Sequence, residues 1–261
     1  MTKYCKVEYN KKGDFMKDKD IIVITGGAGN IAYAVIKKYL SNNCIVIATD
    51  LREDGNKEFE NNPNYHYYKC DVTDVEDIKL LKQKIEEKYN SITHFISMAG
   101  DAVGTDIKGI EYVTIEDIDK TIKLNLSSHI YMTTILLPLL KNSNSDNKTI
   151  TYISSINALR AYDVPVYSAS KAALYGLTRG ILQDLGKLQI RVNIVSPGTI
   201  LKPKEIIENE RTNGKYAEGR PKTKYKDFAI NIDIADAIFS VTHIMKKIEG
   251  QDIVIDAGQM A

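Results

Sequence analysis

Residues 21–40 read IIVITGGAGNIAYAVIKKYL. The β-branched run at residues 21–24 predicts a buried parallel strand, and the helical periodicity of residues 31–40 predicts a helix. The glycine-rich turn between them directs free backbone N–H groups and the positive end of the helix dipole to one point. That point can accept a pyrophosphate, so we expect Gly26, Gly29, Asn30 and Ile31 to bind the phosphates of a nucleotide.

A second predicted strand, residues 44–50, ends in Asp50, 24 residues after Gly26. A carboxylate at that place can accept hydrogen bonds from both ribose hydroxyls of an adenosine and would repel a 2′-phosphate. Arg52 is the only nearby cation. A glycine turn alone is weak evidence, but strand, turn, helix, strand and terminal carboxylate in this order predict a dinucleotide site that prefers NAD to NADP.

The sequence YSASK at residues 167–171 carries the candidate chemistry. Tyr167 and Lys171 are four residues apart, so on a helix they share one face. A phenol has a pKa of about 10, and a cation beside it should lower the pKa of Tyr167 toward neutrality and make it a usable acid or base. A serine at the end of the preceding strand, Ser154 or Ser155, can hydrogen-bond the same substrate oxygen. Y-x-x-x-K arises by chance in many helices and is weak evidence by itself. The nucleotide-binding signature earlier in the chain strengthens the interpretation that Tyr167 and Lys171 are catalytic.

From about residue 21 to the C-terminus, the chain resembles the short-chain dehydrogenase/reductase family in its compact single-domain branch. Several segments match the family's motifs in order. They are the glycine loop after Thr25, residues 70–73, residues 97–100 in place of N-N-A-G, Asn125, residues 153–155, Tyr167 with Lys171, residues 191–198 and residues 250–258.

This resemblance implies an α/β Rossmann-type fold: a doubly wound parallel sheet of about seven strands in a single domain at residues 19–261, after a polar extension at residues 1–18. It implies a catalytic set of Asn125, Ser155, Tyr167 and Lys171, although the usual distance from Tyr167 points to Ser154. The cofactor-binding residues that it implies are Gly26, Gly29, Asn30, Ile31, Asp50, Asp71, Val72, Ala99, Gly100, Tyr167, Lys171, Pro197 and Ile200.

The chain departs from the family pattern at a few positions. Asn30 and Ala32 replace two glycines of the cofactor loop. Asparagine tolerates positive φ better than most residues, so we expect Asn30 to hold the turn. Met98 replaces an asparagine that ties the central strands together, and Lys202 stands where a threonine usually reaches the diphosphate. These changes weaken single contacts and leave the catalytic set intact.

Composition sets further limits. The 261 residues, 43% of them hydrophobic, suffice for one domain with a full core, and a net charge of +1 argues against nucleic-acid or anionic-lipid partners. The apolar run at residues 135–140 is far shorter than the ~20 residues of a membrane span, and no signal peptide is evident. With three cysteines outside any C-x-x-C pair, we expect a cytoplasmic protein with free thiols. The four histidines are scattered, so no metal site is expected.

Strands and helices alternate along the chain. Helices are expected at residues 74–89, 115–140, 167–187 and 234–245, and later strands at 93–98, 148–153, 190–195 and 252–255. The irregular segment 201–231 corresponds to the family's substrate lid. Its basic residues suggest a polar or anionic substrate; they are Lys202, Lys204, Lys215, Arg220, Lys222, Lys224 and Lys226.

The favoured function is an NAD(H)-dependent oxidoreductase that interconverts an alcohol and a ketone or aldehyde. A nucleotide-sugar epimerase or dehydratase shares Y-x-x-x-K but needs a further C-terminal substrate domain. A non-catalytic dinucleotide sensor would typically lose the tyrosine or the lysine.

We also expect a homotetramer, or a homodimer, because two long helices carry apolar residues beyond a single core-facing stripe. A second contact is expected around residues 254–261. The examples on the two helices are Ile130, Met132 and Ile135, and Ala172, Tyr175, Leu177 and Ile181.

Overall fold

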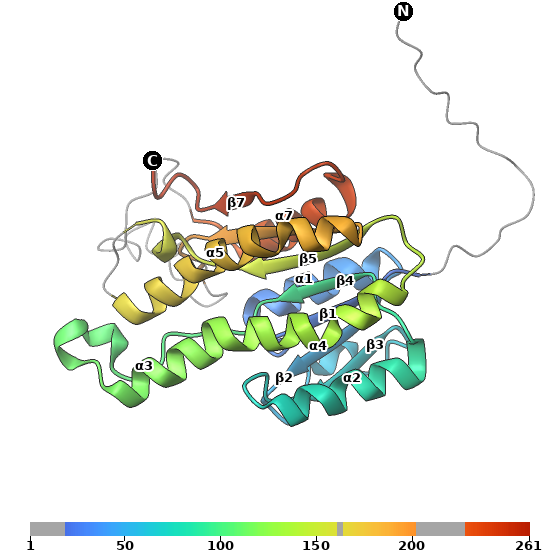
Figure 1. Ribbon diagram of the computed structural model, residues 1–261, viewed down its shortest axis with the longest axis horizontal. Helices are drawn as coiled ribbons and strands as arrows, with labels where there is room; N and C mark the ends of the chain where they lie inside the picture. Colours follow the sequence, from blue (N-terminus) through green and yellow to red (C-terminus); the bar gives the residue numbers. More distant parts are fainter. Residues whose placement is uncertain (1–18, 161–163, 202–227) are drawn as a thin grey trace, which may run out of the picture.

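The computed structural model describes residues 19–160, 164–201 and 228–261 (Figure 1). The predicted extension at residues 1–18, Lys202 and the other basic residues of the predicted lid lie outside the described residues. None of the helices that the structure describes is long and apolar enough to cross a membrane.

Seven strands of the described residues form one parallel sheet in the order β3-β2-β1-β4-β5-β6-β7. They are β1 (Ile21–Thr25), β2 (Ile45–Asp50), β3 (Tyr65–Lys69), β4 (His94–Ser97), β5 (Lys148–Ile153), β6 (Ile190–Pro197) and β7 (Asp252–Ile255). The order reverses beside β1, where β2 lies on one side and β4 on the other. This topology confirms the predicted doubly wound α/β fold and opens a crevice at the carboxyl ends of β1 and β4.

Helices cover both faces of the sheet (Figure 1). Val23 of β1 packs into the core beneath α2, α4 and α5, whereas Ile22 and Ile24 pack into the core beneath α1 and α7. Side chains of a strand point to opposite faces in turn, so an all-apolar strand serves both cores. The helices are α1 (Asn30–Ser41), α2 (Val75–Tyr89), α3 (Ile115–Ile122), α4 (Ser128–Asn142), α5 (Pro165–Lys187) and α7 (Asn231–Phe239).

The predicted helix over residues 115–140 is not one regular helix. A π-helical turn, η4 (Lys123–Ser127), separates α3 from α4, and a second π-helical turn, η7 (Ser240–Ile244), follows α7. Such turns occur mostly as single insertions, frequently at functional sites. In η4 the turn carries the buried Asn125, whose amide forms two hydrogen bonds with the backbone of Asp101. Four short 3-10 turns complete the described elements: η1 (Lys57–Phe59), η2 (Asp106–Lys108), η3 (Ile110–Tyr112) and η5 (Ile156–Ala158).

Candidate active site

The glycine turn after β1 brings the backbone close to the end of β4. Gly26 has φ +69°, and a Cβ on it would lie 3.1 Å from the Cα of Ala99. The Thr25 hydroxyl accepts hydrogen bonds from the backbone N–H groups of Met98 and Ala99, at 3.0 and 3.1 Å. Gly29 caps α1, which begins at Asn30. The left-handed residue of the turn is therefore Gly26, and the expectation that Asn30 supplies a positive φ is wrong.

A cavity of about 910 Å³ lies at this edge of the sheet. It is open toward the start of α1, where the first N–H groups of a helix have no partner within the helix. Most of the predicted cofactor residues line it: Gly26, Gly29, Asn30, Ile31, Asp50, Asp71, Val72, Ala99, Gly100 and Ile200. Pro197 is the last residue of β6. The cavity and the glycine cradle fit a dinucleotide.

Asp50 ends β2 with only 10% of its side chain exposed. Its carboxylate accepts hydrogen bonds from the Ala28 backbone N–H at 3.1 Å and from the Arg52 Nε at 3.2 Å. The Arg52 guanidinium also donates to the Ala28 carbonyl at 2.8 Å. The carboxylate is thus held at the cavity wall, with one cation beside it.

The side chains of Asn125 and Lys171 both lie against Gly100. A Cβ on Gly100 would be 2.5 Å from the Asn125 Oδ1 and 2.8 Å from the Lys171 Nζ. The buried Lys171 ammonium donates to the Ile153 carbonyl at 2.9 Å and lies 5.8 Å from the centre of the Tyr167 ring. Only glycine leaves room for these two side chains, and Gly100 itself lines the cavity.

The two candidate serines face different groups. The Ser155 hydroxyl donates to the Asn157 Oδ1 and accepts from the Asn157 backbone N–H, both at 3.2 Å, and its interaction with the Tyr167 phenol lowers the pKa of that group. Ser154 donates to the Lys171 carbonyl at 3.1 Å, so its hydroxyl is used by the backbone of α5. The geometry therefore brings the hydroxyl of Ser155, and not that of Ser154, to the phenol.

Burial shifts the pKa values of the tyrosine and the lysine in opposite directions. Burial raises the pKa of Tyr167 above its ordinary value of 10.0; the hydrogen bond from Ser155 lowers it and the charge of Asp101 raises it further. Burial lowers the pKa of Lys171 to about 8, and Asp101 partly opposes that change. The expectation that Lys171 lowers the pKa of Tyr167 toward neutrality is therefore wrong for this structure, because desolvation of the phenolate has the larger effect.

Two aspartates at the site have no counterpart among the predicted residues. Asp101 lines the cavity and acts electrostatically on both Tyr167 and Lys171. The fully buried Asp106 accepts hydrogen bonds from the backbone N–H groups of Val166 and Tyr167, at 3.0 and 2.8 Å. Asp101 directly follows the Ala99–Gly100 motif, and this position in the sequence could have identified it as a residue of the site. Asp106 begins the short turn η2, and its place in the sequence gives no signal of this kind.

Comparison with known proteins agrees with this geometry. The family model for short chain dehydrogenase matches residues 20–212. A 7alpha-hydroxysteroid dehydrogenase from Bacteroides fragilis is 27% identical over 248 residues, which cover 92% of this chain and 94% of that protein. A D-threitol dehydrogenase from Mycolicibacterium smegmatis is 24% identical over 253 residues, 94% of each.

The likeness extends to solved structures. The ligand-free aldohexose dehydrogenase of Thermoplasma acidophilum matches with a TM-score of 0.78 at 23% identity, over 93% of this chain and 94% of that one, which shows a common fold. The family match covers most of the chain, including both the glycine turn and the Tyr167–Lys171 pair. The chain therefore belongs to the short-chain dehydrogenase family of oxidoreductases.

Proposed function

We propose that the protein is an NAD(H)-dependent oxidoreductase that interconverts an alcohol and a ketone or aldehyde. The observation that carries this proposal is the hydrogen-bonded Ser155–Tyr167 pair beside Lys171 and Asn125, at the edge of a nucleotide-sized cavity. A phenol and a hydroxyl that share one substrate oxygen are the groups that such a reaction needs.

Each residue of the set has a separate role in this proposal. The nicotinamide, when bound, supplies or accepts the hydride. Tyr167 holds the proton at its phenolic oxygen and exchanges it with the substrate oxygen, which the Ser155 hydroxyl orients. Lys171 contributes a buried positive charge and a donor for the nicotinamide ribose. Asn125 positions a water that connects Lys171 with solvent.

The wall of the cavity supports NAD as the cofactor. Asp50 would accept hydrogen bonds from the adenosine ribose and would face the additional phosphate of NADP. Arg52 is held by Asp50 and by the Ala28 carbonyl, so it compensates only in part. Asp71 and Val72 would lie beside the adenine, and Pro197 with Ile200 beside the nicotinamide.

We infer that the substrate is polar or anionic. The support is the run of basic residues from Lys202 to Lys226 in the sequence, which lies outside the described residues. The names of the relatives cover both a polyol, threitol, and a hydroxysteroid, so they leave the class of substrate open.

A panel assay tests the function. Polyols, hydroxy acids, sugars and a hydroxysteroid are each incubated with NAD and the purified protein, and absorbance follows the reduced nicotinamide. Turnover of a polyol, sugar or hydroxy acid supports the proposal in full, while turnover of the steroid alone contradicts the substrate class. Tight NAD binding without turnover of any member of the panel, or of the matching ketones with NADH, would instead indicate a dinucleotide sensor.

A further inference from the structure

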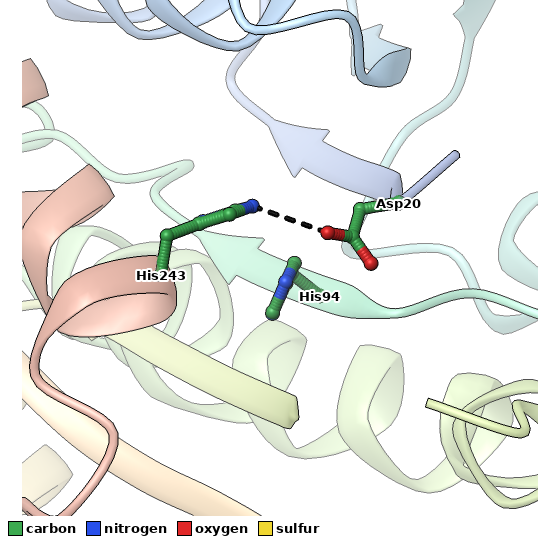
Figure 2. A group of neighbouring side chains, drawn as sticks. All are labelled: Asp20, His94 and His243. Carbon is green, nitrogen blue, oxygen red and sulfur yellow. Dashed lines mark ion pairs between the residues drawn. The ribbon is translucent and has the colours of Figure 1, made fainter. Parts of the chain in front are cut away.

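Three side chains that bind metals in proteins meet at the amino-terminal edge of the sheet, away from the cavity. Asp20 precedes β1, His94 begins β4 and His243 lies in η7. One ligand atom from each lies within 4.8 Å of the other two. Figure 2 shows the His243 ring and the Asp20 carboxylate facing each other with the His94 ring beside them. The strands start at this edge and end at the opposite edge, where the cavity lies, so the cluster is remote from Tyr167.

The register of the sheet explains why these residues converge. Ile22 of β1 pairs with His94 of β4, and Asp20, two residues before Ile22, shares its face of the sheet. The same face is covered by α7 and its continuation η7. There the His243 ring stacks on Phe239, with ring centres 4.4 Å apart, and lies 4.7 Å from the His94 ring.

In the part of the chain that the structure describes, one ring nitrogen of His94 is hydrogen-bonded and the other is not. Its Nδ1 hydrogen-bonds the Thr149 hydroxyl at 2.8 Å, whereas its Nε2 is fully buried and has no hydrogen-bond partner within the described residues. An orphaned buried nitrogen is costly unless something occupies it.

The second imidazole is oriented in the same way. The Thr242 hydroxyl lies within hydrogen-bond distance of the Ile238 and Phe239 carbonyl oxygens, of the Tyr39 hydroxyl at 2.6 Å and of the His243 Nδ1 at 2.8 Å. Because its Nδ1 is engaged by this hydroxyl, the His243 ring presents its Nε2 to the Asp20 carboxylate, at 3.4 Å.

We propose that Asp20, His94 and His243 bind a divalent transition-metal ion of the zinc type. Two imidazoles whose other nitrogens are hydrogen-bonded, together with a carboxylate, form a donor set that zinc favours. Zinc bonds of about 2.0–2.2 Å require the three side chains to move together by about 1 Å. The buried Cys44 thiol lies 4.0 Å from the His243 Nε2 and is a candidate for a fourth ligand.

The ion would have a structural role. It would join the start of β1, the start of β4 and the C-terminal η7, which are distant in sequence, and it would take no part in hydride transfer. The spacing of Asp20, His94 and His243 matches no sequence motif for a metal, which is why the sequence predicts no site.

Calorimetric titration of tag-free, chelator-treated protein with zinc tests the proposal. We expect one ion per chain with a Kd in the micromolar range or tighter, no competition from magnesium, and a Tm that rises by about 5 °C at a hundredfold excess over Kd. His243→Gln should weaken binding at least tenfold and leave turnover unchanged. His66→Gln, which removes a histidine of β3 outside the cluster, should bind zinc as the wild type does.

Anomalous diffraction from wild-type crystals soaked in zinc gives an independent result, whatever the stability of the variant. A single peak among Asp20, His94 and His243 supports the site. A peak only at another position, an unchanged Kd in His243→Gln, or zinc binding no tighter than magnesium binding overturns the proposal. In cobalt-loaded protein, a thiolate charge-transfer band that disappears in Cys44→Ser would add the thiol as the fourth ligand.

Discussion

Lys171 carries a buried ammonium that donates a hydrogen bond to the backbone carbonyl of Ile153. Desolvation favours the neutral amine, which accounts for the fall of its pKa to about 8. Desolvation also favours the neutral form of Tyr167, which raises the pKa of the phenol, so the phenol stays protonated at neutral pH. In this state the pair is set to donate a proton to a carbonyl oxygen, and oxidation of an alcohol requires the phenol to lose that proton first.

The lowered pKa of Lys171 predicts a pH dependence of stability. Between about pH 8 and the ordinary lysine pKa of 10.5, the unfolded chain binds more protons than the folded chain, so stability rises with pH in that window. The gain is at most ~3 kcal/mol, since one pKa unit corresponds to about 1.4 kcal/mol. Urea unfolding of wild type and Lys171→Met at pH 7, 8, 9 and 10 measures it. The wild type should gain stability relative to the variant, and a constant difference would contradict the assignment.

Asp50 and Arg52 predict the choice of cofactor. The carboxylate would face the 2′-phosphate of NADP, and this repulsion should favour NAD by at least ~1.4 kcal/mol, or about tenfold in Kd. Arg52→Ala should increase the preference because it removes the guanidinium that is hydrogen-bonded to Asp50. Calorimetry with both nucleotides measures the two Kd values, with Lys79→Ala on α2 as the control. Equal or tighter binding of NADP by the wild type would contradict the prediction.

At this scale the sequence identifies the reactive residues but not their electrostatics. Register along β5 indicates Ser155, and the hydrogen bond from Ser155 to Tyr167 agrees with it. The effect of Lys171 on the phenol could not be derived from their spacing. It depends on how much water burial removes and on Asp101, and both are properties of the folded site.

Among the elements, α5 determines where Tyr167 lies. The helix starts with Pro165, which suits the first turn. Its next two backbone N–H groups are bonded by the buried carboxylate of Asp106 from the loop before α3. A negative charge at a helix N-terminus is stabilising, and here it also ties the start of α5 to a separate segment.

Replacing Asp106 should affect both stability and turnover. Asp106→Ala leaves two N–H groups without their acceptor, which should cost about 2–4 kcal/mol of unfolding free energy, and it should lower kcat at least tenfold because Tyr167 shifts. Thermal unfolding and steady-state kinetics measure the two effects. Asp74→Ala is the matched control, because Asp74 caps α2 by accepting from the Glu76 N–H at 2.8 Å. It should cost ~1 kcal/mol and leave kcat unchanged; an equal kcat in both variants would contradict a positioning role for Asp106.

Sequence periodicity predicts most elements within a few residues of their observed ends. It does not distinguish an α-helix from the π-helical turns at Asn125 and at residues 240–244, because such turns occur as single insertions inside otherwise regular helices and have no residue pattern of their own. Likewise, the tolerance of asparagine for positive φ did not predict the conformation of Asn30. Gly26 is the residue of this turn that has a positive φ.

For the molecule as a whole, the alternation of strands and helices predicts a parallel sheet with helices on both faces. The order of its strands is known from the structure. The meeting of His94 with His243 does not follow from the sequence, because it depends on the strand register and on how η7 packs against the sheet.

The assembly remains a prediction at this scale. Ile130 of α4 is 39% exposed, and apolar side chains of α5 such as Leu177 and Ile181 are only partly buried. Met132, expected on the same outer face, is 1% exposed and belongs to the core, so that example is wrong. Light scattering at micromolar concentration should give a tetramer, or a dimer, of the 29.3 kDa chain. Ile130→Glu should weaken the assembly, whereas Leu80→Glu on α2 should leave it unchanged. A measured mass of one chain for the wild type would contradict the prediction.

The central claim is that Tyr167 transfers the proton in a hydride-transfer reaction. Its most direct test is turnover by Tyr167→Phe, which removes only the phenolic oxygen, measured with the best substrate of the panel and alongside the Kd for NAD. General acid–base groups contribute ~10²–10⁴-fold to rate, so kcat should fall at least a hundredfold while the Kd changes less than threefold. A variant that keeps more than half of the wild-type activity would contradict the claim.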